Sequence, residues 1–164
     1  KKIFIAAVHG SAAGIGSTLA LACDFLVMSQ KSRLSFVFSN IGLIPDGGAH
    51  WSLSQKLSYN KALEVIINGE HLSASDCEKL GLANKIFEEN NFFSEVENWV
   101  QNLAKRSPLV SRESKQLLRF SKYNDYWDTY NKEKETQARL AKTEDFKNAV
   151  KAFFNKEKPK FFGK

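Results

Sequence analysis

The sequence has 164 residues, 43% of them hydrophobic, so the chain is long enough and apolar enough to form a globular domain with a sizeable core. No run approaches the roughly 18 uninterrupted apolar residues of a membrane helix, and the start of the sequence does not resemble a signal peptide. Neither a membrane span nor secretion is therefore expected, and a cytoplasmic location is the expectation. Cys23 and Cys77 are too few and too isolated for a disulfide framework or a zinc site, and both are predicted to be small core residues.

The net charge of +6 results from 24 basic and 18 acidic side chains, and it is concentrated near the C-terminal end. The lysines that gather there are Lys151, Lys156, Lys158, Lys160 and Lys164. Such a cluster favours an anionic partner such as a nucleotide or a phosphate, and a solvated basic face explains it equally well. No interleaved pattern of aromatic and basic residues accompanies the lysines, so nucleic acid is not an expected partner.

The first part of the chain has the pattern of an α/β unit. Residues 3–8 are apolar and uninterrupted, which is typical of a strand buried on both faces in a largely parallel sheet. Residues 14–22 predict a short helix of small side chains, and residues 25–28 predict the next strand. The order strand, helix, strand within so short a span indicates an α/β fold.

Further short elements are predicted up to residue 92. They are a strand at 34–36, a helix from the turn at 45–48 to Leu57, a helix at 60–67, a helix at 73–81 and a strand or extended segment at 82–87. Asn60 is the expected N-cap of its helix. Ser73, an acid three residues later and a closing glycine are typical of a compact capped helix.

The character of the chain changes at residue 93, after which glycine is absent until Gly163 and apolar residues recur at helical spacing. The predicted helices cover about 93–103, a segment after Pro108, 126–142 and 144–154. The chain therefore divides into an α/β part at residues 1–92 and an all-helical part at residues 93–164. Amphipathic helices without a sheet of their own must pack on the α/β part or on a partner subunit.

Two glycine turns carry the candidate chemistry. In the first, Gly14 and Gly16 lie at the start of a predicted helix; the second, at residues 42–50, has Asp46 at its apex. Glycine lets backbone N–H groups approach a ligand closely, and a helix N-terminus favours negative charge. The two turns together suggest an acyl-transfer or enolate-type site. The glycine spacing does not match a dinucleotide-binding fingerprint, the histidines have no metal-ligand spacing, and no metal is expected.

Four separated motifs run in order along the chain. They are AAVHGSAAGIGSTLALACD, SFVFSNIGLIPDGGAHWSLSQKL, ALEVIINGEHLSASDCEKLGLANKIF and AFFNKEKPKFFGK. In this order they resemble the enoyl-CoA hydratase/isomerase (crotonase) family over essentially the whole chain. The resemblance implies a partial α/β spiral of ββα units followed by a C-terminal helical region that mediates trimerisation. It also implies an acyl-CoA thioester as partner, with coenzyme A as part of the substrate rather than a separate cofactor, and a homo-oligomer that is a trimer or a dimer of trimers.

The chemistry implied by this resemblance is the stabilisation of a thioester enolate by two backbone N–H groups, an oxyanion hole. The turn at residues 13–16 resembles the family's second donor loop, with the donor on Ile15 and with Gly14 and Gly16 beside it. A strand-to-helix turn without a ligand is the alternative. The first donor loop does not appear in this sequence. The chain is therefore expected to be the C-terminal portion of a longer protein, with a shortened relative and an incomplete site as the alternative.

The catalytic acids distinguish subfamilies. By resemblance, Thr18 and Phe38 occupy the positions at which hydratases carry glutamates, so hydration by two glutamates is not expected. Asp46 occupies the position of the single acid of several isomerase-type relatives. An apolar wall of Phe38, Ile41 and Leu43 is expected to desolvate this carboxylate and to raise its proton affinity. The alternative interpretation is that Asp46 only caps the following helix.

The tail at residues 156–161 resembles the family's closing K-x-P-x-F segment, which implies that Lys158 and Lys160 lie near the phosphates of coenzyme A. A frayed, solubilising tail is the alternative. The resulting expectation is an enoyl-CoA double-bond isomerase. Two alternatives stay open, namely a hydratase or other acyl-CoA enzyme of the family, and a non-catalytic module that binds coenzyme A or a partner protein.

Overall fold

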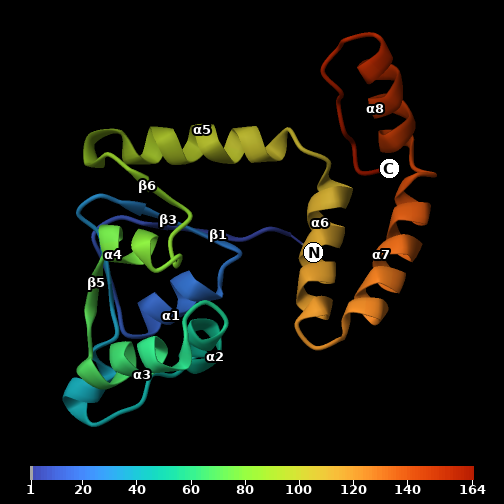
Figure 1. Ribbon diagram of the computed structural model, residues 1–164. Coiled ribbons are helices and arrows are strands. Elements are labelled where there is room, and N and C mark those ends of the chain that lie inside the picture. Colours follow the sequence, from blue (N-terminus) through green and yellow to red (C-terminus); the bar gives the residue numbers. More distant parts are fainter. Residues whose placement is uncertain (1) are drawn as a thin grey trace. The chain divides into compact units, whose positions relative to one another are not determined.

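The computed structural model of the protein describes residues 2–164, which divide into two compact units (Figure 1). One unit comprises Phe4–Glu97 and contains both sheets of the described chain. The other comprises residues 98–164 with Lys2 and Ile3, and its regular structure is helical. This order, mixed α/β followed by all-helical, is the one that the sequence predicts.

Two three-stranded sheets form the α/β unit. The first is parallel and has the order β1 (Ile5–Val8), β3 (Phe25–Ser29), β6 (Lys85–Phe87). The second has the order β2 (Ser11–Ala13), β4 (Arg33–Ser35), β5 (His71–Ser73). In it, β2 and β4 are parallel with Ala13 opposite Ser35, whereas β4 and β5 are antiparallel with Ser35 opposite His71. Ser35 of β4 therefore pairs with a residue of β2 on one side and with a residue of β5 on the other. Its partner Ala13 is the last residue of β2, just before the first helix starts at Ile15.

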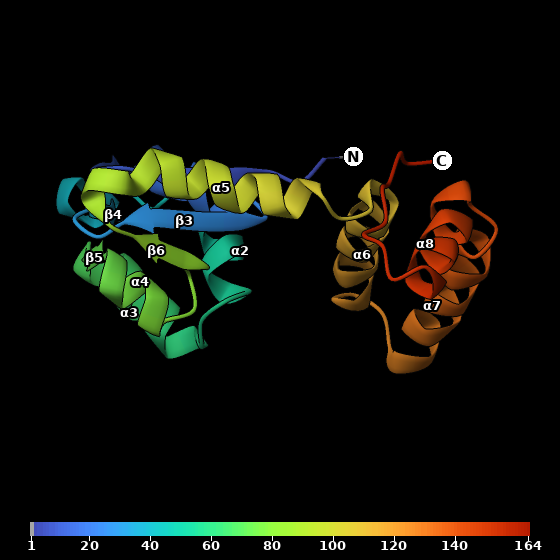
Figure 2. The ribbon, with the colours of Figure 1, turned by 90° about the horizontal axis from the view of Figure 1, so that it is seen from above.

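Helices pack against these sheets and close the core. They are α1 (Ile15–Ala22), α2 (Ala49–Ser54), α3 (Tyr59–Asn68) and α4 (Ala74–Lys79), with 3-10 turns η1 (Val37–Ile41) and η2 (Glu89–Asn91). Figure 2 shows α3 and α4 on the same side of β3 and β6. The core between them is apolar and includes Leu26, Met28, Phe36, Val65 and Leu82, all fully buried.

Three expectations about this unit are wrong in detail. The strand buried on both faces is β3, whose residues from Leu26 onward are buried; β1 lies at the sheet edge and is only half-buried. The N-cap of α3 is Ser58, whose side chain accepts a hydrogen bond from Lys61 N–H, and not Asn60. Cys23 is only half-buried, whereas Cys77 is buried as expected.

Helix α2 ends at Ser54, before the expected Leu57. The capped helix at residues 73–81 is confirmed as α4, in which Ser73 and Asp76 form a reciprocal capping box. The three-residue strands β2 and β5 were not expected from the sequence, because a strand of this length has too few residues to show an alternating pattern.

The helical unit contains α6 (Pro108–Ser121), α7 (Tyr126–Leu140) and α8 (Glu144–Phe154), and α5 (Phe92–Ala104) leads into it. Side-chain oxygens of Ser107, Asp125 and Thr143 cap the last three helices, which satisfies N–H groups that the first turn leaves unpaired. Helices α6 and α7 form an antiparallel pair (Figure 1). The bounds predicted for α8 are confirmed. None of the helices in residues 2–164 is long and apolar enough to cross a membrane.

The tail after α8 is fixed by a buried carboxylate. Asp145, in the first turn of α8, accepts hydrogen bonds from Phe162 N–H at 2.7 Å and from Gly163 N–H at 2.9 Å. The backbone N–H of Asp145 in turn donates to the carbonyl of Lys164 at 3.0 Å. Residues 162–164 are therefore held against the start of α8, directly after the segment at residues 156–161 for which a frayed tail is the alternative.

Candidate functional site

The first glycine turn joins the end of β2 to the start of α1. Gly14 has φ 53° and ψ −124°, a conformation in which an L side chain would be strained. Its N–H donates to the carbonyl of Ser35 at 2.9 Å, which ties the turn to the end of β4. An ideal Cβ on Gly14 would lie 3.7 Å from the Phe38 ring, so the Phe38 side chain packs over this turn. Glycine is required here by the backbone rather than by crowding.

Ile15 is the first residue of the eight-residue helix α1, so its N–H has no acceptor within the helix. No group in residues 2–164 accepts a hydrogen bond from this N–H. The residue is 47% exposed, and the positive end of the helix dipole adds to the pull on an anion at this point. The predicted donor position is thus a backbone N–H that is available to a ligand oxygen.

The second glycine turn packs directly against this helix start. An ideal Cβ on Gly47 would lie 2.5 Å from Ile15 Cδ1 and 3.1 Å from Thr18 Cγ2. Gly47 has φ +63°, so both its backbone and its surroundings exclude a side chain. Gly47, which directly follows Asp46, is therefore in contact with the predicted donor residue Ile15, although residues 15 and 47 are 32 positions apart in the sequence.

Asp46 does not cap the helix that follows it. The N-cap of α2 is Gly48, with φ 88°, and no side chain of the described chain accepts a capping hydrogen bond there. Within residues 2–164 the Asp46 carboxylate has no hydrogen-bond or ion-pair partner, and the residue is exposed. The capping interpretation is therefore wrong, and the carboxylate is not committed to any structural interaction in this part of the protein.

The apolar wall expected around Asp46 is also absent from the described chain. Ile41 is 73% and Leu43 is 58% exposed, and only Phe38 is half-buried. The segment is fixed mainly through its backbone, with Leu43 N–H donating to the Phe38 carbonyl at 3.1 Å. No described side chain covers its outer face, so the expected desolvation of Asp46 is not found in residues 2–164.

Thr18 lies one helical turn after Gly14 and is completely buried. Its methyl group faces Gly47, while its hydroxyl Oγ1 has no hydrogen-bond partner among residues 2–164. A buried hydroxyl without a partner is destabilising, so this position is not optimised for folding alone. Thr18 could be identified from its place in the motif, but its burial could not be predicted from the sequence.

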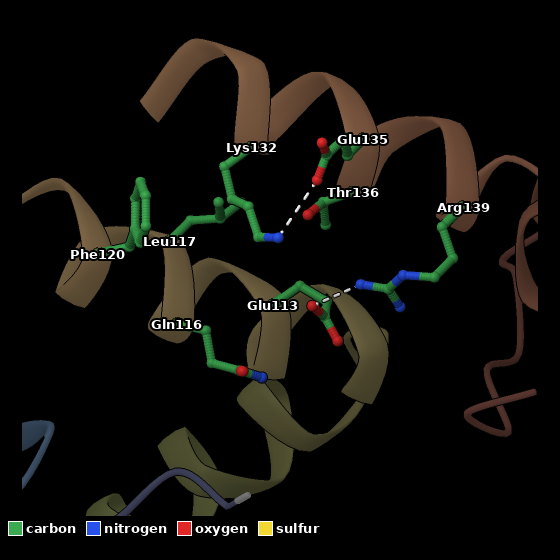
Figure 3. Close-up of a pocket in the computed structure, with 8 residues that line it drawn as sticks. All are labelled: Glu113, Gln116, Leu117, Phe120, Lys132, Glu135, Thr136 and Arg139. Carbon is green, nitrogen blue, oxygen red and sulfur yellow. Dashed lines mark hydrogen bonds and ion pairs between the residues drawn. The ribbon is translucent and has the colours of Figure 1, made fainter. Parts of the chain in front are cut away.

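A cavity of about 380 Å³ lies between α6 and α7 in the helical unit, and sequence analysis did not predict it (Figure 3). Its lining consists of Glu113, Gln116, Leu117, Phe120, Lys132, Glu135, Thr136 and Arg139. Figure 3 shows Glu113 and Arg139 approaching each other from the two helices, with their ion pair at 2.7 Å. Hydrogen bonds from Arg139 and Arg112 hold the pKa of the buried Glu113 carboxyl below its usual range. Glu135 pairs with Lys132 at 3.2 Å, so the charges that line this cavity neutralise one another.

Lys158 and Lys160 are exposed residues of the helical unit, within the segment that leads to the fixed tail. Their predicted contact with coenzyme A phosphates stays a prediction. Residues 2–164 contain no group of three or more His, Cys, Asp or Glu residues arranged to hold a metal ion.

This mixed α/β fold has one glycine turn with a free helix N–H, packed against a second glycine turn that carries an exposed carboxylate. Such a fold defines a class of proteins able to bind an anionic oxygen at a backbone site. Similarity to known proteins makes this class specific. The chain belongs to the enoyl-CoA hydratase/isomerase family, whose family model matches residues 1–164.

Individual relatives agree with the family assignment. The chain is 33% identical over 162 residues to a putative enoyl-CoA hydratase/isomerase of Bacillus subtilis, covering 98% of this chain and 63% of the relative. It is 29% identical to a trans-2-decenoyl-[acyl-carrier-protein] isomerase of Streptococcus mutans, covering 99% of this chain and 62% of the relative. A crystal structure of an enoyl-CoA hydratase from Polaromonas sp. JS666 superimposes with a TM-score of 0.93 at 34% identity, covering 98% of this chain and 63% of that one.

The expected crotonase-like fold is confirmed by this structural relative. The chain spans less than two thirds of the length of the relatives named above. Relatives with hydratase names and relatives with isomerase names match at similar identity. The expectation that a first donor loop belongs to the complete protein stays a prediction.

Proposed function

We propose that this protein is an enoyl-CoA double-bond isomerase that works through a thioester enolate. In this proposal the Ile15 N–H is one of the two donors that bind the enolate oxygen, and Gly14 and Gly16 let the thioester approach the backbone. Asp46 removes a proton from one carbon of the acyl chain and returns it to another. One carboxylate is sufficient for this reaction, because the same group acts first as base and then as acid.

The observation that carries the proposal is the contact between the two glycine turns. Gly47 packs on Ile15 and Thr18, and Asp46, whose carboxylate has no structural partner in the described chain, is the residue before Gly47; this contact supports the proposal. Thr18 and Phe38, which replace the hydratase glutamates, cannot act as the acid and base that water addition requires. Asp46 is therefore the acid that the second glycine turn contributes to proton transfer.

Substitution of Asp46 tests this role in the full-length protein. The substrate is a β,γ-unsaturated acyl-CoA, and the assay follows the absorbance of the conjugated α,β-unsaturated thioester as it forms. We expect Asp46→Asn to lower kcat by about a hundredfold or more, since positioned proton transfer contributes about 10²–10⁴-fold. Glu64→Gln is the matched control, because it neutralises an exposed acid on α3 that pairs only with Lys61 in this unit.

Three outcomes would contradict the proposal in different ways. Full isomerase activity in Asp46→Asn would remove Asp46 from proton transfer. Faster hydration of an α,β-unsaturated acyl-CoA than isomerisation by the unmodified protein would favour a hydratase. Binding of coenzyme A without turnover of either substrate would favour a non-catalytic binding module.

We also propose that Lys158 and Lys160 bind the phosphates of coenzyme A and that the protein assembles as a homotrimer or a dimer of trimers through its helical region. The aromatic cluster of Tyr126, Trp127 and Tyr130 on α7 supports an interface there, since these rings contact one another and all three are exposed in the described chain. Sedimentation velocity of the full-length protein measures the assembly, and a monomer at micromolar concentration would contradict it.

A further inference from the structure

We infer that Ser17 is a positioning residue that fixes the orientation of the Ile15 N–H, an inference that rests on the proposed function. Ser17 lies in the first turn of α1 and is completely buried. Its hydroxyl donates to the carbonyl of Ala12 at 2.6 Å and accepts a hydrogen bond from the Ser35 N–H at 2.9 Å. One side chain therefore joins the start of the helix to the ends of β2 and β4.

The network closes around the donor. Ser35 donates its N–H to Ser17 and accepts the Gly14 N–H at its carbonyl at 2.9 Å. Gly14 and Ser17, which flank residues 15 and 16, are thus both hydrogen-bonded to Ser35 of β4. Ile15 itself has no backbone N–H partner within residues 2–164, so the direction of its N–H is set by these two flanking attachments.

Orientation matters because a preorganised donor stabilises charge only when it points at the position that the developing oxyanion takes. Misplacement by about 1 Å can cost about 10²-fold in rate. Ser17 is not the N-cap of α1, which is Gly14 without a side-chain cap. Removal of the Ser17 hydroxyl therefore leaves the helix caps as they are. It leaves the Ser35 N–H without the acceptor that it has in the described chain and removes the bond to the Ala12 carbonyl, so that the Gly14 N–H bond to the Ser35 carbonyl is left to hold the turn.

The experiment compares Ser17→Ala with Ser32→Ala in the full-length protein. Ser32 is a matched control, because its hydroxyl is also buried and hydrogen-bonded, to the Ser29 carbonyl at 2.7 Å, but does not touch the glycine turns. We expect Ser17→Ala to lower kcat for isomerisation by about 10-fold to 100-fold with little change in KM, and Ser32→Ala to leave both near their original values. Thermal unfolding of both variants shows that each is folded at the assay temperature.

A second measurement does not depend on turnover. Amide hydrogen exchange of Gly14, followed by NMR in the unliganded protein, should be faster in Ser17→Ala than in the unmodified protein and unchanged in Ser32→Ala. Unchanged kcat, equal losses in both variants, or unchanged exchange at Gly14 would each overturn the positioning role. If the unmodified protein does not turn over enoyl-CoA at all, the proposed function fails, and the exchange measurement alone then decides whether Ser17 fixes the turn.

Discussion

Replacement of Gly47 by alanine tests the contact between the two glycine turns. The new Cβ would lie 2.5 Å from Ile15 Cδ1 and 3.1 Å from Thr18 Cγ2. The end of the Ile15 side chain can rotate away, because Ile15 is 47% exposed. Thr18 cannot move as easily, since it is buried and its β-branched side chain has few rotamers in a helix. The positive φ of +63° adds backbone strain that alanine cannot avoid.

Gly48→Ala separates the two causes. Gly48 also has a positive φ, +88°, but nothing lies within 4 Å of its Cβ position, so it reports backbone strain alone. We expect Gly48→Ala to lower the free energy of unfolding by about 1 kcal/mol and Gly47→Ala by about 2–3 kcal/mol, the excess coming from overpacking. Urea unfolding followed by circular dichroism measures both.

Truncation of Ile15 in the Gly47→Ala background should restore the share of the loss that the Cδ1 contact causes. Equal losses in the two glycine variants would refute the reasoning, because they would show that the turn at residue 47 does not press on α1. Isomerase activity should follow the same order, since only Gly47→Ala displaces the residue that carries the proposed donor.

Two further predictions concern the helical unit. Asp145→Ala should release residues 162–164, lower the free energy of unfolding by about 1–3 kcal/mol and speed tryptic cleavage after Lys160; an unchanged cleavage rate would show that Asp145 does not hold the tail. The pKa of Glu113 is lowered by Arg139 and then Arg112, so its contribution to stability is fully present above the ordinary glutamate pKa and is lost as pH falls through the folded-state value. Unfolding free energies of the unmodified protein and Glu113→Gln should therefore converge on acidification below about pH 4.3, and a constant difference down to pH 2 would contradict this.

Local signals predicted the elements that have strong end markers. The helix at 144–154 was predicted to the residue, and the capped helix after Ser73 was predicted with its cap, because capping depends on residues close in sequence. The N-cap of α3 was predicted two residues late, at Asn60, since serine and asparagine are both good caps and periodicity does not choose between them. Burial of β3 rather than β1 depends on sheet order, which no local pattern contains.

The site divides in the same way. The glycine turns and the location of Asp46 could be predicted because they lie in short contiguous motifs. The exposure of Asp46 and Leu43 could not, because burial depends on what packs over a segment from elsewhere. The hydroxyl of Ser17 bonds to Ser35, 18 residues later in the chain, and a serine beside a glycine turn carries no sign of such a partner. Parallel pairing of β2 with β4 brings them together.

The donor proposed at Ile15 belongs to the peptide backbone, which has a consequence for genetics. Every amino acid except proline supplies the same N–H at this position, so a mutational scan would record residue 15 as tolerant even if the reaction depended on it completely. The sensitive positions in such a scan would be Gly14, Ser17 and Gly47, which shape the turn without supplying the donor. A map of mutational tolerance would thus mark the residues that shape the turn and miss the N–H that binds the ligand. Replacement of the backbone amide at residue 15 by an ester, through chemical synthesis, would be needed to reveal the role of this N–H.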